Sequence, residues 1–154
     1  MKKLFVAIAA ILLVSFTVSG CMAVLPKKDL KPSDYDTGMT MEKALKQDKP
    51  IAAVFYADWC TYCQRFMPKM DKVRSQYQKD VNFVLLNVES PENEEYVQEY
   101  RIGAFPTVYM IDKKFDNKSH IDSAFLDTTK NFETEVARFN RIHGLLEKAS
   151  KCEK

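Results

Sequence analysis

This sequence has almost no net charge, and nothing in it repeats. Its 154 residues carry 23 Lys and Arg against 21 Asp and Glu, a formal net charge of +2 at pH 7. Two of the lysines, Lys2 and Lys3, lie in a segment that we expect to be removed, and the remainder is formally neutral. Proteins that bind nucleic acids need a basic excess. The composition therefore predicts no nucleic-acid partner.

Cysteine is also scarce. Four thiols are too few for a disulfide framework in a chain of this length, and their spacing is not that of a paired zinc site; they are Cys21, Cys60, Cys63 and Cys152. A zinc ion held by Cys60 and Cys63 would need two more ligands. The candidates for these further ligands are His120, His143 and Cys152, and none of them has a suitable spacing. We predict no metal site, and each cysteine needs its own explanation.

The apolar run from Leu4 to Val14 is too short to cross a bilayer comfortably as a permanent helix. It follows a short positive region and ends in small residues, as a cleavable signal does. A membrane anchor and an ordinary signal peptide both fit this pattern. The stretch Val18-Ser19-Gly20-Cys21, however, resembles the bacterial lipobox, in which the cysteine becomes the diacylglyceryl-modified first residue of the mature protein.

The lipobox resemblance divides the chain into three parts. Residues 1–20 are expected to be a lipoprotein signal peptide, residues 21–37 a lipid anchor and tether, and residues 38–150 one folded domain. The tether is polar and contains Pro26 and Pro32, which stiffen it. A lipidated Cys21 would hold the protein at a membrane of the cell envelope, in the periplasm, where cytosolic thiols do not suppress disulfides. The choice between inner and outer membrane stays open.

The folded part has the composition of one globular domain, with 46% hydrophobic and 29% charged residues. Apolar patterns predict strands at residues 51–57, 81–88, 106–111 and 119–125. Helices are predicted at residues 41–47, from about 60 to 77, at 90–100 and from about 129 onwards. Helical spacing gives the last helix one apolar face, formed by Phe132, Val136, Phe139, His143 and Leu146. The order of elements predicts an α/β sandwich of three layers, a mixed sheet with helices on both faces.

The chain is organised around the stretch from Phe55 to Pro68, which reads FYADWCTYCQRFMP. Cys60 and Cys63 stand two residues apart at the start of a helix, where they can close into a disulfide and reopen. Unpaired backbone N–H groups and the helix dipole stabilise an anion at the first of them. A structural disulfide and half of a zinc site are the alternatives. Proline within the helical pattern, at Pro68, predicts a kink.

These residues together resemble the thioredoxin superfamily over roughly residues 38–148. Trp59, Cys60 and Cys63 match the active-site motif, and Pro68 matches the helix-kink proline. Pro106, in Phe105-Pro106-Thr107, matches the cis-proline that faces the cysteines. Within the superfamily, the stretch is most similar to the membrane-anchored, lumen-facing thioredoxin-like proteins of cyanobacteria and thylakoids. The resemblance to those proteins implies a supply of reductant for cytochrome assembly.

The sequence departs from thioredoxin at positions that matter for the chemistry. Val54 stands where thioredoxin has a buried aspartate, and Leu85 replaces the lysine partner of that aspartate. Thr61-Tyr62 occupies the place of Gly-Pro between the cysteines. Proton transfer at Cys63 therefore has to use water or another group. The redox potential cannot be carried over, because the dipeptide tunes it in this family.

The resemblance implies a role for each residue of the motif. Cys60 is the expected nucleophile and Cys63 the resolving thiol, and their disulfide is the only redox group, with no separate cofactor. Pro106 leaves the backbone of Phe105 free to pair with a substrate strand, although a proline opening a strand is the alternative. Expected substrate-binding residues are Trp59, Thr61, Tyr62 and Phe105. For Trp59 and Tyr62, packing is the alternative.

Three further residues keep more than one interpretation. Asp58 is interpreted as a solvated surface carboxylate, with proton transfer at the cysteines as the alternative. His143 is interpreted as a partly buried packing residue, with metal ligation as the alternative. Cys152, in a charged tail, is interpreted as an incidental free thiol, with a third redox role as the alternative.

The leading functional hypothesis is a monomeric, lipid-anchored thiol–disulfide oxidoreductase that reduces envelope proteins. Its partners would be protein disulfides or dithiols and an upstream electron donor in the membrane. The same cysteine pair could instead serve a disulfide oxidant or isomerase. A hypothesis of another class is a non-enzymatic envelope lipoprotein, a binding module in which the two cysteines form a permanent disulfide.

Overall fold

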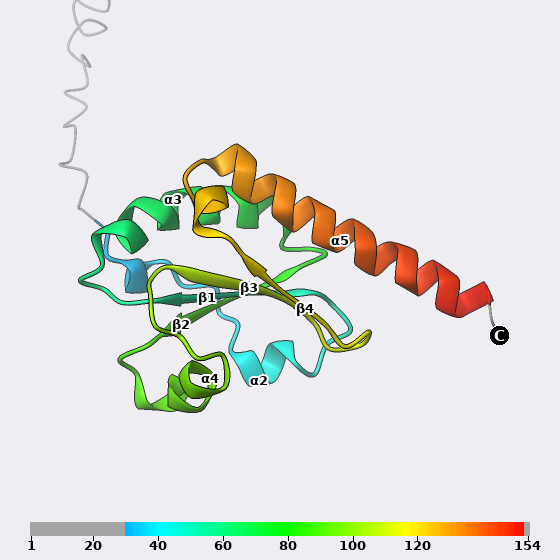
Figure 1. Ribbon diagram of the computed structural model, residues 1–154, viewed down its shortest axis with the longest axis horizontal. Coiled ribbons are helices and arrows are strands. Elements are labelled where there is room, and N and C mark those ends of the chain that lie inside the picture. Colours follow the sequence, from blue (N-terminus) through cyan, green and yellow to red (C-terminus); the bar gives the residue numbers. More distant parts are fainter. Residues whose placement is uncertain (1–29, 153–154) are drawn as a thin grey trace, which may run out of the picture.

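A four-stranded sheet forms the centre of the molecule, seen in a computed structural model that describes residues 30–152 (Figure 1). The strands run in the order β2-β1-β3-β4, and their bounds are β1 Ile51–Tyr56, β2 Asn82–Asn87, β3 Thr107–Asp112 and β4 Asn117–Ile121. β1 is parallel to β2 and antiparallel to β3, and β3 is antiparallel to β4. The sheet is therefore mixed, as predicted.

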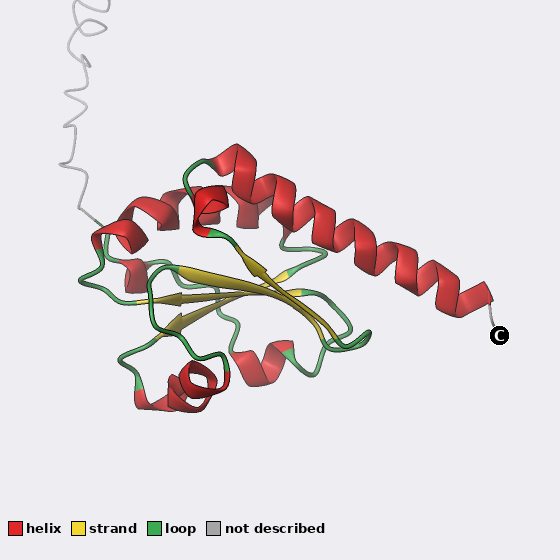
Figure 2. Ribbon diagram, in the orientation of Figure 1, coloured by secondary structure: helices red, strands yellow, loops and turns green. Residues whose placement is uncertain are grey.

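Helices cover both faces of this sheet (Figure 2). α3 (Thr61–Tyr77) and α5 (Thr129–Cys152) lie on one face, and α2 (Met41–Ala44) and α4 (Glu94–Glu99) lie on the other. Alternate side chains of β1 point to opposite faces. Thus Val54 joins the core under α3 and α5, whereas Phe55 joins the core under α2 and α4. The three-layer α/β sandwich is confirmed.

The two long helices pack through the faces that the sequence predicted. α3 buries Phe66, Met70 and Val73 against the sheet. α5 buries Phe132, Val136, Phe139 and His143, and the ring of Phe132 meets that of Phe66 edge to face at 5.0 Å. α5 then continues past the end of the sheet (Figure 1). This packing fixes the start of α3, where the cysteine motif lies.

The prediction of a strand over residues 119–125 was wrong at both ends. β4 begins at Asn117 and ends at Ile121. A 3₁₀ helix, η3 (Ser123–Leu126), follows it. The Asp122 carboxylate caps this turn by accepting a hydrogen bond from Ala124 N at 2.9 Å. A local cap of this kind competes with strand pairing, so the chain turns here and returns toward α3.

The helix predicted at residues 90–100 consists of two pieces. A 3₁₀ turn, η2 (Pro91–Asn93), precedes α4. Asn93 N donates to Ser90 O at 2.9 Å, and its side-chain amide donates to Asn87 O at 2.9 Å. These bonds tie the turn to the end of β2 and delay the start of α4. The predicted helix at residues 41–47 is likewise shorter, although Thr40 caps it by accepting from Lys43 N.

The tether predicted to extend to residue 37 is folded in its last part. Residues Pro32–Asp34 form the 3₁₀ turn η1, in which Pro32 is buried. Lys31 N donates to the Asp34 carboxylate at 2.9 Å, and Tyr35 packs against the core under α3. These residues belong to the domain, because their side chains have partners there. The predicted signal peptide, Cys21 and the tether up to residue 29 lie outside the described residues.

None of the helices within residues 30–152 is both long enough and apolar enough to cross a membrane.

Candidate active site

Cys60 lies between the end of β1 and the first turn of α3. Its backbone caps that helix, and its sulfur accepts a hydrogen bond from Cys63 N at 3.2 Å. Cys60 N donates to Ala57 O at 3.2 Å, which closes the turn that leaves the strand. An N–H group aimed at a sulfur from a helix N-terminus stabilises the thiolate over the thiol. This contact positions the Cys60 sulfur at the N-terminus of α3, where the sequence predicts the nucleophile.

Cys63 occupies a different environment one turn further along α3. Its side chain is fully buried, and both cysteines are free thiols in this structure. Burial, and then the hydrogen bond and charge of Cys60, raise the pKa of the Cys63 thiol to about 12. The pair is thus asymmetric, although both side chains are buried: Cys60 keeps 6% of its surface exposed, whereas Cys63 keeps none and has the raised pKa.

The loop before β3 completes the site from the opposite side. The Cys60 thiol donates to Phe105 O at 3.5 Å, so the backbone of this loop contacts Cys60. The bond between Phe105 and Pro106 is cis, which is the isomer that the resemblance implied. Pro106 itself has no N–H. The structure therefore brings the two cysteines and the predicted proline loop together.

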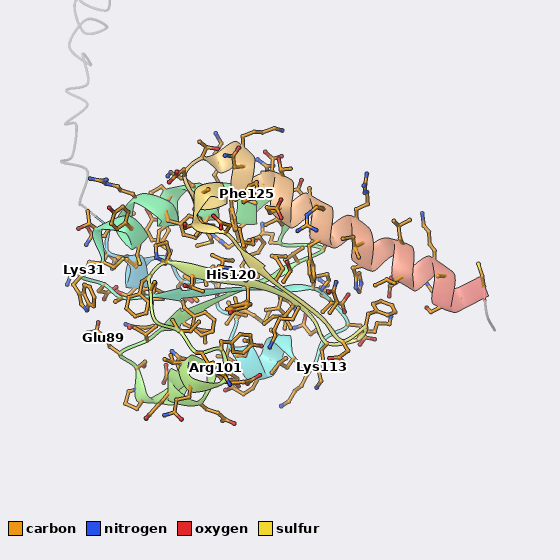
Figure 3. The ribbon with its side chains drawn as sticks, in the orientation of Figure 1. Lys31, Glu89, Arg101, Lys113, His120 and Phe125 are labelled. Atoms are coloured by element: carbon orange, nitrogen blue, oxygen red, sulfur yellow. The ribbon has the colours of Figure 1, made fainter. Side chains whose placement is uncertain are left out.

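Aromatic side chains form an exposed rim around Cys60. Trp59 is 66% exposed and Tyr62 is 71% exposed. The Trp59 ring meets the Phe105 ring edge to face at 6.1 Å, and its indole N–H donates to Glu89 at 3.0 Å. Glu89 lies at the same end of the sheet as Lys31, and Lys113 marks the opposite end (Figure 3). Of the predicted substrate-binding residues, Trp59 and Phe105 contact each other beside Cys60, and Thr61 and Tyr62 begin α3 directly after it. Glu89 was not predicted.

Asp58 has a structural partner that the sequence did not reveal. Its two carboxylate oxygens accept from Ser33 N at 2.9 Å and from the Ser33 hydroxyl at 2.8 Å. Its backbone carbonyl accepts from the Gln64 side chain at 2.9 Å. The carboxylate is therefore neither freely solvated nor directed at the cysteines. It joins the N-terminal turn to the loop that carries Cys60.

The departures from thioredoxin lie side by side in the core. Val54 and Leu85 are partners in the register of β1 and β2. Val54 belongs to the buried core cluster that contains Cys63, and the partly buried Leu85 packs against that cluster. Within the described residues, the buried polar side chains are those of Asn82, Asp112 and His143, outside that cluster. No carboxylate replaces the missing aspartate there.

His143 is buried, as the packing interpretation predicted, but it also has a specific partner. Its Nδ1 lies 2.8 Å from the carboxylate of Asp112, which is 2% exposed. The Phe115 ring packs edge to face on the imidazole at 5.6 Å. Asp112 ends β3, so this pair joins α5 to the end of the sheet away from the cysteines. The Asp112 contact was missed because the two residues are 31 positions apart. Cys152 is exposed at the end of α5.

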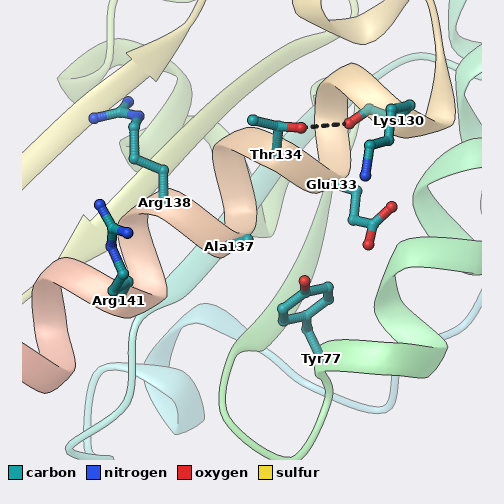
Figure 4. Close-up of a pocket in the computed structure, with 7 residues that line it drawn as sticks. All are labelled: Tyr77, Lys130, Glu133, Thr134, Ala137, Arg138 and Arg141. Carbon is teal, nitrogen blue, oxygen red and sulfur yellow. Dashed lines mark hydrogen bonds between the residues drawn. The ribbon is translucent and has the colours of Figure 1, made fainter.

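Two hollows in the surface differ in their relation to the cysteines. One, of about 470 Å³, lies between Tyr77 at the end of α3 and the residues Lys130, Glu133 and Arg141 of α5 (Figure 4). Tyr77 is 14 residues after Cys63, which is about 21 Å along a helix. The other, of about 600 Å³, is lined by Tyr62, Phe105 and Pro106. Of these two, the second lies beside Cys60, because its lining residue Phe105 accepts a hydrogen bond from the Cys60 thiol, so it is the candidate substrate site.

Comparison with known proteins agrees with this geometry. Thioredoxin-like protein HCF164, chloroplastic, of Arabidopsis thaliana is 33% identical over 94 residues, 61% of this chain and 34% of that protein. The thiol:disulfide interchange protein TxlA homolog of Synechocystis is 36% identical over 69 residues, 45% of this chain and 38% of that protein. The chain therefore spans about a third of the length of these curated relatives.

Solved structures show the same fold. Mitochondrial thioredoxin 3 of Saccharomyces cerevisiae is 25% identical and matches 61% of this chain and 82% of its own, with a TM-score of 0.50. Chloroplastic thioredoxin z is 18% identical and matches 67% of this chain and 92% of its own, with a TM-score of 0.56. The family model for thioredoxin matches residues 34–132. This match covers more than half of the sequence and includes both cysteines and Pro106, so the chain belongs to the thioredoxin family.

Proposed function

We propose that this protein is a thiol–disulfide oxidoreductase that acts on protein disulfides through Cys60 and Cys63. The observation that carries the proposal is the asymmetry of the pair. Cys60 accepts a hydrogen bond from Cys63 N at 3.2 Å and lies within an exposed aromatic rim. Cys63 is fully buried behind it, and burial raises the pKa of its thiol. A permanent structural disulfide would need neither arrangement.

The reaction follows from this arrangement in two exchanges. The Cys60 thiolate attacks one sulfur of a substrate disulfide, and the other substrate sulfur leaves as a thiolate. Cys63 then loses its proton and attacks the Cys60 sulfur of the mixed disulfide. The Cys60–Cys63 disulfide forms, and the substrate leaves with its second thiol. Two electrons pass from the protein to the substrate, and an upstream dithiol donor has to return them for turnover.

The experiment that tests this function is disulfide reduction by the purified domain with dithiothreitol as the donor. Insulin disulfides should be reduced by the wild-type protein, and Cys60→Ser should abolish the reduction. Cys152→Ser is the matched control, because Cys152 is an exposed free thiol at the end of α5, and it should reduce insulin normally. Unchanged reduction by Cys60→Ser would overturn the proposal.

Trapping identifies the substrates. Cys63→Ala removes the resolving thiol, so each mixed disulfide with Cys60 should persist and carry its substrate with it. Proteins of the cell envelope are the expected partners, apocytochromes among them. The double variant Cys60→Ser/Cys63→Ala is the control and should capture none of these proteins. If both variants capture the same proteins, the assignment of Cys60 as the nucleophile is contradicted.

The direction of electron flow is a separate part of the proposal. We assign the reducing direction, as the resemblance to reductant-supplying proteins implies. The competing role is that of a disulfide oxidant or isomerase. The absence of a carboxylate near Cys63 favours it, because no neighbouring negative charge then disfavours a thiolate at Cys60, and a stable thiolate shifts the pair toward the oxidising role. Equilibration with a glutathione buffer distinguishes them. A potential close to that of thioredoxin supports the reductase, and a potential close to that of a strong periplasmic oxidant refutes it.

Anchoring through a lipidated Cys21 is also part of the proposal and rests on the lipobox pattern. It would place the domain at a membrane of the envelope, within reach of a membrane-bound electron donor. Labelling of the protein with a radioactive fatty acid in a bacterial host should depend on Cys21. Equal labelling of Cys21→Ser would refute this part of the proposal and would leave the chemistry of Cys60 untouched.

A further inference from the structure

A groove runs away from the cysteine pair between α3 and the loop that carries Pro106. Its volume is about 600 Å³. One wall is a single face of α3, on which the lining residues recur at helical spacing: Tyr62, Arg65, Phe66 and Lys69. The other wall is made by residues before β3 and by η3 with the residue after it: Ala104, Phe105, Pro106, Ser123, Ala124, Leu126 and Asp127. Two turns of helix extend about 10 Å, which matches about three residues of an extended peptide.

The two cations of this groove are used differently. Lys69 Nζ donates to the carbonyl of Asp127 at 2.6 Å and to that of Leu126 at 3.4 Å, so it holds the far wall in place. Arg65 is exposed, and no ion pair or hydrogen bond of its guanidinium occurs within the part of the chain that the structure describes. Its donors are therefore open to a ligand in the groove.

The remaining lining fixes where a charged ligand group would fit. Tyr62, Phe105 and Pro106 line the groove at the end near Cys60. The acidic residue of the lining, Asp127, lies at the Lys69 end, because Lys69 binds its carbonyl. A negative group is therefore attracted most strongly at Arg65, because the charges of Lys69 and Asp127 offset each other at the far end. Arg65 is five residues after Cys60, about 7.5 Å along the helix, which corresponds to about two residues of an extended peptide.

We propose that Arg65 is a specificity-determining residue and that the groove selects substrate cysteines flanked by an acidic residue. The occupant is an extended segment of the protein substrate. It carries an apolar side chain against Tyr62 and Phe66 and a carboxylate about two residues from the reacting cysteine. Guanidinium and carboxylate match each other in a planar, two-bond geometry. This inference rests on the proposed function, because it concerns the first exchange at Cys60.

The test measures that first exchange with peptides of known charge. Each peptide carries one cysteine, linked by a disulfide to a coloured nitrothiobenzoate group, with Glu, Gln or Lys two residues before or after it. The Cys60 thiolate attacks the peptide sulfur, the disulfide to the dye breaks, and the dye leaves as a thiolate. The Cys152→Ser protein, reduced beforehand, supplies the electrons for this single turnover.

The expected result is an order of reactivity. With the variable residue either two positions before or two positions after the cysteine, the Glu peptide should release the dye about threefold to fivefold faster than the Gln peptide and about tenfold faster than the Lys peptide. One of the two placements is enough to support the inference. Arg65→Glu should invert the order, and Arg65→Lys should keep it in weaker form. The preference should also decrease at high salt, because the contact is exposed. Arg141→Glu is the matched control: Arg141 is exposed and lines the other hollow (Figure 4).

The remaining outcomes separate this inference from the proposed function. Equal rates for the three peptides, all lost in Cys60→Ser, would overturn the role of Arg65 and leave the oxidoreductase intact. Dye release that survives Cys60→Ser would overturn the proposed function itself. Self-association of the wild-type protein that Arg65→Glu abolishes would overturn the inference in favour of a second copy of the chain in the groove. An inverted order in Arg141→Glu would show a nonspecific effect of net charge and would also overturn it.

Discussion

The buried Cys63 thiol makes the second exchange depend steeply on pH. Its pKa is raised from 9.0 to about 12, and burial is the largest cause. At pH 7 the neutral thiol therefore predominates strongly over the reactive thiolate. Because Val54 and Leu85 occupy the places of the family's charged pair, no carboxylate in this core accepts the proton. We predict that the resolution step accelerates about tenfold for each unit of pH between pH 6 and 9.

The perturbation that tests this explanation is Val54→Asp. Val54 is fully buried in the same core cluster as Cys63, so burial should raise the pKa of the new carboxyl group. Above that pKa, the carboxylate can accept the proton of Cys63, and general base catalysis of this kind gives about 10²-fold to 10⁴-fold. The variant should be less stable by about 2–4 kcal/mol, because a polar group is buried without a partner. Val54→Asn has the same cost but supplies no base.

The assay follows a disulfide reagent with two coloured leaving groups, mixed rapidly with the reduced Cys152→Ser protein. Attack by Cys60 releases the first group, and attack by Cys63 releases the second. The second phase should be slow in the wild-type protein, slow in Val54→Asn and about 100-fold or more faster in Val54→Asp. A second phase that does not change between pH 6 and 9 in the wild-type protein would refute the reasoning. Equal acceleration by Val54→Asp and Val54→Asn would refute it as well.

Three further changes test the packing around the site. The neutral Cys63 thiol contributes stability that is complete below pH 9 and is lost as the pH rises to about 12. The free energy of unfolding of the reduced wild-type protein, measured with urea, should therefore fall by about 4 kcal/mol more over this range than that of Cys63→Ser. His143→Leu should cost about 3–5 kcal/mol, because the buried Asp112 carboxylate loses its side-chain partner and keeps only the hydrogen bond from Phe115 N. Asp112→Asn in the same chain should restore at least half of this loss, and a loss below about 1 kcal/mol would contradict the reasoning. Ser33→Ala should lower the free energy of unfolding by about 1 kcal/mol and speed amide hydrogen exchange near Asp58, because the hydroxyl contact with the Asp58 carboxylate is lost. Unchanged exchange would show that this contact is not formed in solution.

Local patterns in the sequence were enough to predict most of the fold. Strands buried on two faces, such as Ile51–Tyr56, appear as continuous apolar runs. The stripe through Phe66 and Met70 predicted the inner face of α3. These features depend on burial and helical period, which the sequence expresses directly. The cysteine pair and Pro106 were predictable for another reason, since the spacing and order of these residues are characteristic of one superfamily.

The features that were missed depend on contacts between distant residues. Ser33 and Asp58 are 25 positions apart, and Asp112 and His143 are 31 positions apart. No periodicity connects such pairs. The end of β4 was missed for a local reason, because the Asp122 carboxylate caps the turn that follows the strand by accepting from Ala124 N. The groove beside Cys60 is thus shaped in part by contacts, such as that of Lys69 with Asp127, that local patterns do not express.

The most direct test of the central claim is a redox titration of the pair. Cys152→Ser protein is equilibrated with buffers of known dithiol to disulfide ratio, and the fluorescence of Trp59, the single tryptophan, reports the state of the neighbouring Cys60. Cys60 and Cys63 should change together as one two-electron couple, with a tenfold change in ratio for about 30 mV. A fluorescence signal that does not respond, or two thiols that alkylation shows to oxidise independently, would contradict the account.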